Sequence, residues 1–168
     1  PAARYYRQMC LCQTLAPGPH SVHSSPMPTA NPAFAVPLRR SQPHPCFGAG
    51  VVNGVICAGT NCDDVSMYST AGAARATIGT VAHGTASVFQ KKAFPSPITL
   101  APGNYFMAFT CDNVLATFAR SSYGAAFTQL AGVRQLAAFF ALTASATSWI
   151  GNTNTFTPAF GIYEASWL

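Results

Sequence analysis

Alternation of apolar and polar side chains with a period of two predicts short β-strands along most of this chain after residue 48. The clearest case is the stretch 96–113, where residues 98–100 alternate and an aromatic-rich run follows at 105–110. Between them, Ala101-Pro102-Gly103-Asn104 predicts a tight turn that joins both runs as a hairpin, because proline presets a negative φ and glycine accepts a positive one. Both faces of the second run are apolar, so we expect a central strand covered on both sides.

The same pattern predicts further strands at 51–57, 64–69, 77–83, 85–90, 114–119, 135–142 and 160–165. Helical spacing is present only in part, over 125–142, and Gly132 interrupts it, so we expect a loop or a single helical turn near 128–132. About eight to ten short strands separated by turns are typical of a sandwich or jelly roll. The predicted fold class is therefore all-β, a jelly-roll-like antiparallel β-sandwich.

Residues 1–48 differ from the rest of the chain because they hold most of its 13 prolines. Proline disfavours both helix interiors and central strands. We therefore expect an extended, Pro-rich N-terminal arm at 1–48 that serves as a docking segment, followed by a β-sandwich domain at 49–168. Within the arm, only 34–38 suits a first edge strand.

The chain has 168 residues, of which 49% are hydrophobic and only 8% are charged. About a quarter of the residues are charged in a typical soluble domain, so we expect much of the surface to face other protein, first of all further copies of the chain. The net charge of +5 comes from scattered lysines and arginines, which argues against a nucleic-acid partner. No apolar run reaches the roughly 18 residues of a membrane span, so we expect no membrane insertion.

Three segments carry a recognisable pattern: Asp64-Val-Ser-Met-Tyr-Ser-Thr-Ala-Gly72, Ala76-Thr-Ile-Gly-Thr80 and Ile98-Thr-Leu-Ala-Pro-Gly-Asn-Tyr-Phe-Met-Ala108. They resemble the structural proteins of tailed bacteriophages, in which a strand and a small Ala-Gly turn precede an L-x-P-G-x-Y hairpin. The resemblance implies a virion protein with a jelly-roll domain: a tail fibre, head fibre, capsid decoration or receptor-binding tip, often a homotrimer. The expected partners are then copies of itself and, through residues 1–48, other virion proteins. The Pro-rich, Cys-bearing arm departs from the family's pattern.

The six cysteines permit several disulfide pairings. Cys57 and Cys62 bracket a predicted turn and form a candidate disulfide, provided that their Cα atoms lie within about 7 Å. Cys10 and Cys12 would share one side of an extended arm and are candidates for pairing between chains. The alternative is that most cysteines are small buried hydrophobic residues, which we favour for Cys111.

The sequence gives little support to catalysis or metal binding. Its four carboxylates include the neighbours Asp63 and Asp64, which would point to opposite faces of a strand. No nucleophile elbow, phosphate loop or H-E-x-x-H motif is present, and any Ser-rich chain offers serines to a histidine such as His83. We therefore expect no enzyme and no cofactor. Zinc-type ligands occur without the repeated C-x₂-C pairs of structural zinc sites, at Cys10, Cys12, His20, His23, His44 and Cys46.

Most aromatic residues have the spacing of core side chains, but three lie in polar loops or at the C-terminus: Tyr123, Trp149 and Trp167. Exposed aromatic rings stack on sugars or anchor protein interfaces. With Asn152 and Asn154 nearby, Tyr123 and Trp149 make a candidate glycan site. The alternative function is therefore a carbohydrate-binding tip that recognises a host surface glycan, with Trp167 better suited to a subunit interface.

Overall fold

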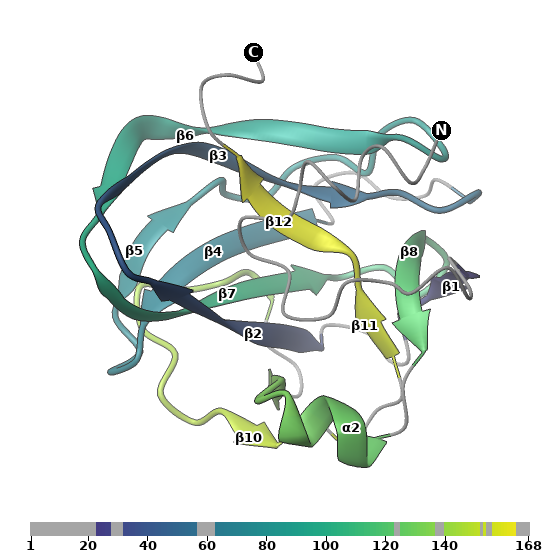
Figure 1. Cartoon of the computed structure of the whole chain (residues 1–168). Coiled ribbons are helices and arrows are strands. Elements are labelled where there is room, and N and C mark those ends of the chain that lie inside the picture. The colour runs from purple at the N-terminus through teal and green to yellow at the C-terminus, as the bar shows by residue number, and fades with distance from the viewer. Residues whose placement is uncertain are drawn as a thin grey trace.

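The computed structural model describes residues 23–27, 32–56, 63–122, 125–136, 140–151, 153 and 156–163. In these residues the chain forms short strands and one helix (Figure 1). The elements are β1 (His23–Pro26), β2 (Ala33–Arg40), β3 (His44–Val52), β4 (Asp63–Ser69), β5 (Ala74–Thr77), β6 (Phe89–Leu100), β7 (Gly103–Cys111), β8 (Thr117–Ser122), α2 (Ala125–Leu130), β9 (Arg134–Leu136), β10 (Ile150–Gly151), β11 (Phe156–Pro158) and β12 (Phe160–Tyr163).

The strands form two packed layers, and all pairs within them are antiparallel. One layer is a six-stranded sheet in the order β10-β9-β2-β7-β4-β5, and the other consists of the sheets β12-β3-β6 and β1-β8-β11. The last two sheets continue into each other at Ala159, whose carbonyl accepts from Val52 N (2.9 Å) and whose N–H donates to Ala119 O (2.8 Å). The all-β class and the antiparallel β-sandwich are thus confirmed.

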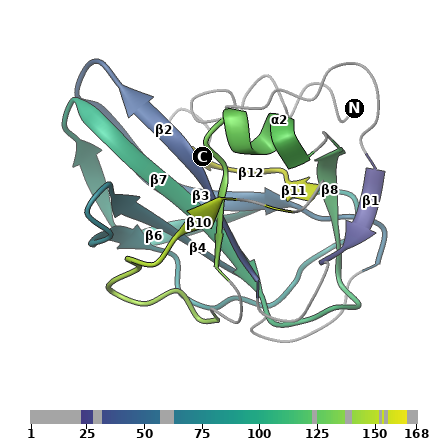
Figure 2. The ribbon, with the colours of Figure 1, turned by 90° about the horizontal axis from the view of Figure 1, so that it is seen from below.

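A long two-stranded ribbon, folded over on itself, connects the layers. β2 pairs with β7 in one sheet, β3 pairs with β6 in the other, and the register runs on from Arg40↔Gly103 to His44↔Leu100. Both strands of the ribbon therefore turn the same corner, at 41–43 and 101–102, on the left of Figures 1 and 2. The predicted hairpin within 96–113 is wrong, because β6 and β7 belong to different sheets. A Pro-Gly turn suits such a corner as well as it suits a hairpin.

β7 is a central strand with cover on both faces, as its sequence predicts. It lies between β2 and β4. Its inner face, with Met107 and Phe109, joins the core between the layers, and its outer face contributes Ala108 to a second apolar cluster. Leu142 and Trp149 of the same chain pack in this second cluster, so the outer cover comes from the segment that follows β9.

The strand predicted at 34–38 is present within β2, although it lies between β9 and β7 rather than at an edge. The prediction of an extended arm is wrong for residues 39–48, which complete β2 and supply most of β3. The prolines are tolerated where the strand has a neighbour on one side only. Pro37 pairs with β7 beyond the end of β9, and Pro45 pairs with β6 beyond the end of β12. The predicted boundary therefore cuts through β3, while residues 1–22 lie outside the described part of the chain.

Other boundaries also differ from the prediction. Residues 94–97 lie inside β6, an edge strand whose pairing with β3 shifts register between Cys46 and Gly48, so Pro95 and Pro97 fall opposite an irregularity. The predicted strand at 135–142 shortens to β9, and α2 precedes it. Propensity alone does not place these limits, because packing against the neighbouring sheet decides them.

Phe109 is the central side chain of the core. Its ring lies 5.0 Å from that of Phe118 and 5.6 Å from that of Phe160, both in the opposite layer. We expect Phe109→Ala to lower the free energy of unfolding by about 3–5 kcal/mol, because it removes a fully buried ring and leaves a cavity. Urea denaturation measures this. Leu130→Ala, at a side chain that is 86% exposed, is the control and should change stability by less than about 0.5 kcal/mol. Equal effects would contradict the central position of Phe109.

Candidate functional site at the loop end of the sandwich

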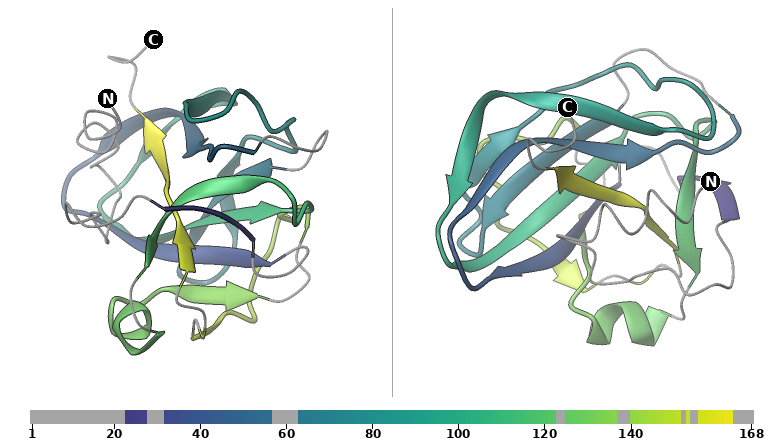
Figure 3. Two further views of the ribbon diagram at one scale, coloured as in Figure 1. Left: turned by 90° about the vertical axis from the view of Figure 1, so that its right-hand side faces the viewer. Right: turned by 45° about the horizontal axis from the view of Figure 1, so that its top comes forward.

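Three loops meet at the end of the sandwich opposite the two corners, which we call the loop end: residues 53–56, 78–88 and 112–116. The left view of Figure 3 looks onto this end. Gly54 joins the loops, since its N–H donates to Thr117 O (2.7 Å) and its carbonyl accepts from Ser87 N (2.8 Å). Loops tied to one another by backbone hydrogen bonds at the end of a β-sandwich are where such folds commonly carry function.

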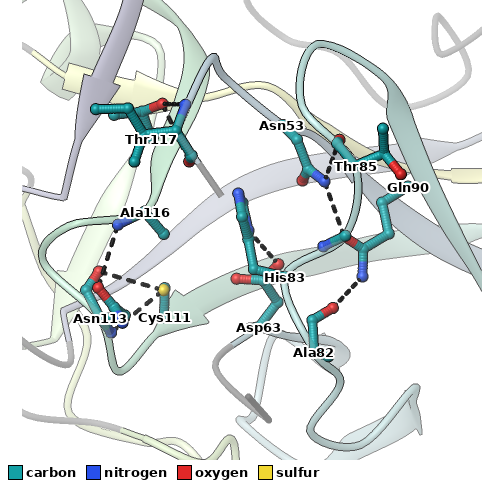
Figure 4. A network of polar contacts seen from close by, with 12 residues as sticks. Asn53, Asp63, Ala82, His83, Thr85, Gln90, Cys111, Asn113, Ala116 and Thr117 are labelled. Carbon is teal, nitrogen blue, oxygen red and sulfur yellow. Dashed lines mark hydrogen bonds and ion pairs between the residues drawn. The ribbon is translucent and has the colours of Figure 1, made fainter. Parts of the chain in front are cut away.

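Asp63 and His83 form a buried pair beneath the loop end (Figure 4). Asp63 begins β4, and His83 comes from loop 78–88. The carboxylate Oδ2 lies 2.8 Å from Nδ1 of the imidazole, and the side chains are 1% and 0% exposed. A hydrogen bond therefore joins these two atoms, and the tautomer of the imidazole sets which of them donates. Nε2 is buried and faces away from Asp63, and no described group forms a hydrogen bond to it.

The geometry of this pair favours a structural role over a catalytic one. A carboxylate on Nδ1 orients the imidazole of acid–base dyads, but catalysis also needs a reacting group at Nε2. Here the ring is packed edge-on against Phe118, with centroids 4.8 Å apart, and solvent does not reach it. The pair therefore fastens loop 78–88 to the start of β4. The described part of the chain holds no group of three or more His, Cys, Asp and Glu side chains placed to bind a metal ion.

A second polar network holds the same loop against β3 and β6. Asn53 Nδ2 donates to Thr85 O (3.0 Å) and to Gln90 Oε1 (2.9 Å). The same Gln90 oxygen accepts from Gly84 N (2.6 Å), while its Nε2 donates to Ala82 O (2.5 Å). Two side-chain amides thus bond three backbone polar groups of this loop, namely Ala82 O, Gly84 N and Thr85 O.

Asn113 organises the third loop. Its Oδ1 accepts from Leu115 N (2.7 Å) and Ala116 N (3.1 Å), the pattern by which an Asn side chain stabilises a turn. Cys111 is a buried thiol, as predicted, and its Sγ accepts from Asn113 N at 3.3 Å. Asp112 and Asn113 thus begin the turn that follows β7.

The loop end presents a patch of exposed aliphatic side chains, which we call the apolar tip: Val55 (65% exposed), Ile56 (52%), Val88 (38%), Val114 (44%) and Leu115 (66%). Within the described loop residues, Asp112 is the sole charged side chain that is exposed. Single exposed aliphatic residues are ordinary, but five of them on three neighbouring loops are a candidate interaction surface.

Two further buried polar groups lie on the outer face of the six-stranded sheet. Asp64 accepts from Thr77 Oγ1 (3.2 Å) and from Leu142 N (3.0 Å), and burial raises the pKa of its carboxyl despite these hydrogen bonds. Tyr68 donates to Thr143 O (2.8 Å). Burial, with a smaller contribution from the Asp64 charge, raises the pKa of Tyr68 to about 12. These two residues fasten segment 142–149 over the sheet.

Of the site residues predicted from sequence, only Trp149 belongs to the described part of the chain, and it lies on the outer face of the six-stranded sheet rather than at the loop end. Trp149 is half-buried and meets the Tyr68 ring edge to face, with centroids 6.1 Å apart. Sequence reasoning missed the Asp63–His83 pair, since nothing in a separation of 20 residues marks two side chains as partners. The one feature of the sequence that could have pointed to Asp63 is that the chain has only four carboxylates. The other predicted site residues are outside the described part: Cys10, Cys12, Cys57, Cys62, Tyr123, Asn152, Asn154 and Trp167.

We expect Asp63→Ala to destabilise the protein by about 3–5 kcal/mol, because it leaves the imidazole buried without its partner. Asp112→Ala removes an exposed carboxylate and is the matched control. In a double-mutant cycle with His83→Ala, measured by urea denaturation, the double variant should lose about 0.5–3 kcal/mol less than the sum of the single variants. Strict additivity would show that the pair does not couple the loop to β4.

The buried carboxyl of Asp64 makes the free energy of unfolding depend on pH, and the sign of this dependence follows from the burial. Its pKa is raised above the unfolded value of 3.8, so the folded state binds the proton more tightly. Its stabilising contribution is complete below pH 3.8 and is lost as the pH rises through the higher folded-state pKa. The stability of wild type relative to Asp64→Asn should therefore increase as pH falls from neutrality, as urea denaturation at several pH values can test. A difference that stays constant or reverses would contradict this, and Asp112→Asn is the exposed control.

Comparisons with protein-family models, with curated proteins and with solved structures gave no match. Within the described residues, no helix is long and apolar enough to span a membrane. The loop end itself combines two features: loops held by the Asp63–His83 pair and the Asn53–Gln90 network, and exposed aliphatic side chains on those loops.

Proposed function

We propose that this chain is a structural subunit that assembles with copies of itself through the apolar tip. The observation that carries the proposal is the group of aliphatic side chains exposed on a rigid loop end, in a chain of which only 8% is charged. Apolar patches fixed in this way are typical of protein–protein contacts, whose centres are depleted of charge. The buried Asp63–His83 pair and the Asn53–Gln90 network serve assembly by holding the loops in one conformation before contact.

The resemblance to tailed-bacteriophage structural proteins supports the more specific form of the proposal. In that form the chain is a component of the virion, as a knob, fibre or decoration subunit, and it assembles as a homotrimer. Copies that meet with their tips around a rotation axis bury the same patch in each subunit, which is the closed symmetry of most homo-oligomers.

A carbohydrate-binding tip is less well supported by the described residues. The Trp149 ring packs against Tyr68 in the second apolar cluster, and so it does not present an open platform for a sugar ring. The described loop end presents aliphatic rather than aromatic side chains. Self-assembly is therefore the function that the geometry favours.

We expect Leu115→Asp and Val55→Asp each to weaken self-association, because each places an unpaired charge at the centre of an apolar contact. A loss of about 2 kcal/mol, typical of a central contact residue, corresponds to roughly 30-fold weaker association. Size-exclusion chromatography with light scattering over a concentration series measures it. Leu130→Asp, at the most exposed aliphatic residue outside the tip, is the control and should leave assembly unchanged. A wild-type chain that stays monomeric, or tip variants that assemble normally, would refute the proposal.

A further inference from the structure

The outer face of the β12-β3-β6 sheet is largely apolar and is buried along β12 and β3, although no described helix or strand covers it. Alternation along β3 turns Ala49 and Val51 into the core and therefore turns Gly48, Gly50 and Val52 outward. We call this outward side the outer apolar face. In the right view of Figure 3 the three strands lie at the front of the molecule, with no other described helix or strand ahead of them.

Two aromatic rings lie across the glycines of this face. A Cβ at Gly48 would collide with the Tyr163 ring, and a Cβ at Gly50 would lie 2.7 Å from the Phe89 ring. Lys91 adds its ammonium group 5.8 Å from the centre of the Tyr163 ring. Glycine allows an aromatic ring from the neighbouring strand to lie flat on the sheet, and the result is a smooth, largely apolar surface.

The low solvent accessibility of side chains on this face shows that another segment lies against it. Tyr163 is 2% exposed, although its ring rests on the sheet from outside. Beside it, Val52 (7%), Ala119 (4%) and Ala159 (4%) form a separate buried cluster whose described packing partner is the half-buried Phe89. Burial also raises the pKa of Tyr163. Small side chains on the outside of a sheet reach this degree of burial only beneath another segment.

We propose that residues 1–22 of the same chain cover the outer apolar face. The described chain begins at His23 in β1, which pairs with β8 in the same layer. With strands about 4.8 Å apart, the width from β1 across to β6 is on the order of 20 Å. A segment of 22 residues spans up to roughly 70 Å when extended, so it reaches the whole face. Its sequence fits, because it has apolar and aromatic residues, among them Tyr5, Tyr6, Met9 and Leu11, and its only charges are Arg4 and Arg7.

This inference is independent of the self-assembly proposed above, since the apolar tip and the outer apolar face are different surfaces. It assigns the N-terminal segment to its own sandwich rather than to another particle protein. Covering the face in this way removes an apolar surface that would otherwise compete with the tip for contacts between copies.

A photocross-link in the full-length chain tests the assignment. Phe89→p-benzoylphenylalanine keeps an aromatic ring on the face, and mass spectrometry after irradiation identifies what it contacts. We expect cross-linked peptides from residues 1–22 of the same chain, and none from the same probe at Ala71, an exposed residue in the turn between β4 and β5. Cross-links confined to residues 164–168, or to a second copy in a mixture of isotopically labelled and unlabelled chains, would overturn the proposal.

A second measurement uses trypsin, which can cut the segment after Arg7. Ala159→Asp places a carboxylate beneath the cover, so cleavage after Arg7 should become roughly tenfold faster or more. Ala71→Asp is the matched control on an exposed residue and should leave the rate unchanged. Cleavage after Arg134, in the interior of the six-stranded sheet, reports general unfolding and must keep its wild-type rate for the comparison to count. An unchanged rate after Arg7 in a folded variant would overturn the proposal, and where Ala159→Asp unfolds the sheet, the cross-link decides.

Discussion

The folded ribbon of β2-β3 and β6-β7 is the constraint on which the rest of this structure depends. Its two strands stay in register through the corner, from Arg40↔Gly103 to His44↔Leu100, so pairing in one layer fixes pairing in the other. β4 and β9 add to one half of the ribbon and β12 adds to the other half. The corner also places the opposite ends of these strands together, which is why three loops far apart in sequence meet at the loop end.

Carboxylates are few in this chain, and most of the described ones are buried. Of the three described carboxylates, Asp63 and Asp64 are buried on opposite faces of β4, each fastening a different segment to the sandwich. A buried charge is costly unless it is paired, so each of these segments must keep its position. The surface is left with few acidic groups, and contacts made by the apolar tip need to desolvate little charge.

The all-β class, the central position of β7 and its two covered faces could be predicted from sequence, because they follow from local alternation. The strands predicted at 77–83 and 85–90 could not, since most of these residues form loop 78–88. The corner at 101–102 could not, since the same Pro-Gly chemistry serves a hairpin and a crossing between sheets. The strands around Pro37 and Pro45 could not be placed for a similar reason: proline is excluded from a strand only where both neighbours are present, and sequence does not show where β9 and β12 end. The Asp63–His83 pair depends on the path of loop 78–88, which no local pattern encodes.

The two apolar surfaces of the molecule differ in solvent exposure, and this difference affects which of them can contact a partner. The apolar tip is exposed, with Leu115 at 66%, whereas the outer apolar face is buried, with Tyr163 at 2%. An exposed surface on loops held by buried polar networks can meet a partner without prior rearrangement, so little conformational entropy is lost on contact. A buried face must first lose its cover before it can bind anything else. The proposed association between copies is therefore assigned to the tip, whereas the outer apolar face would contribute to the stability of the single subunit.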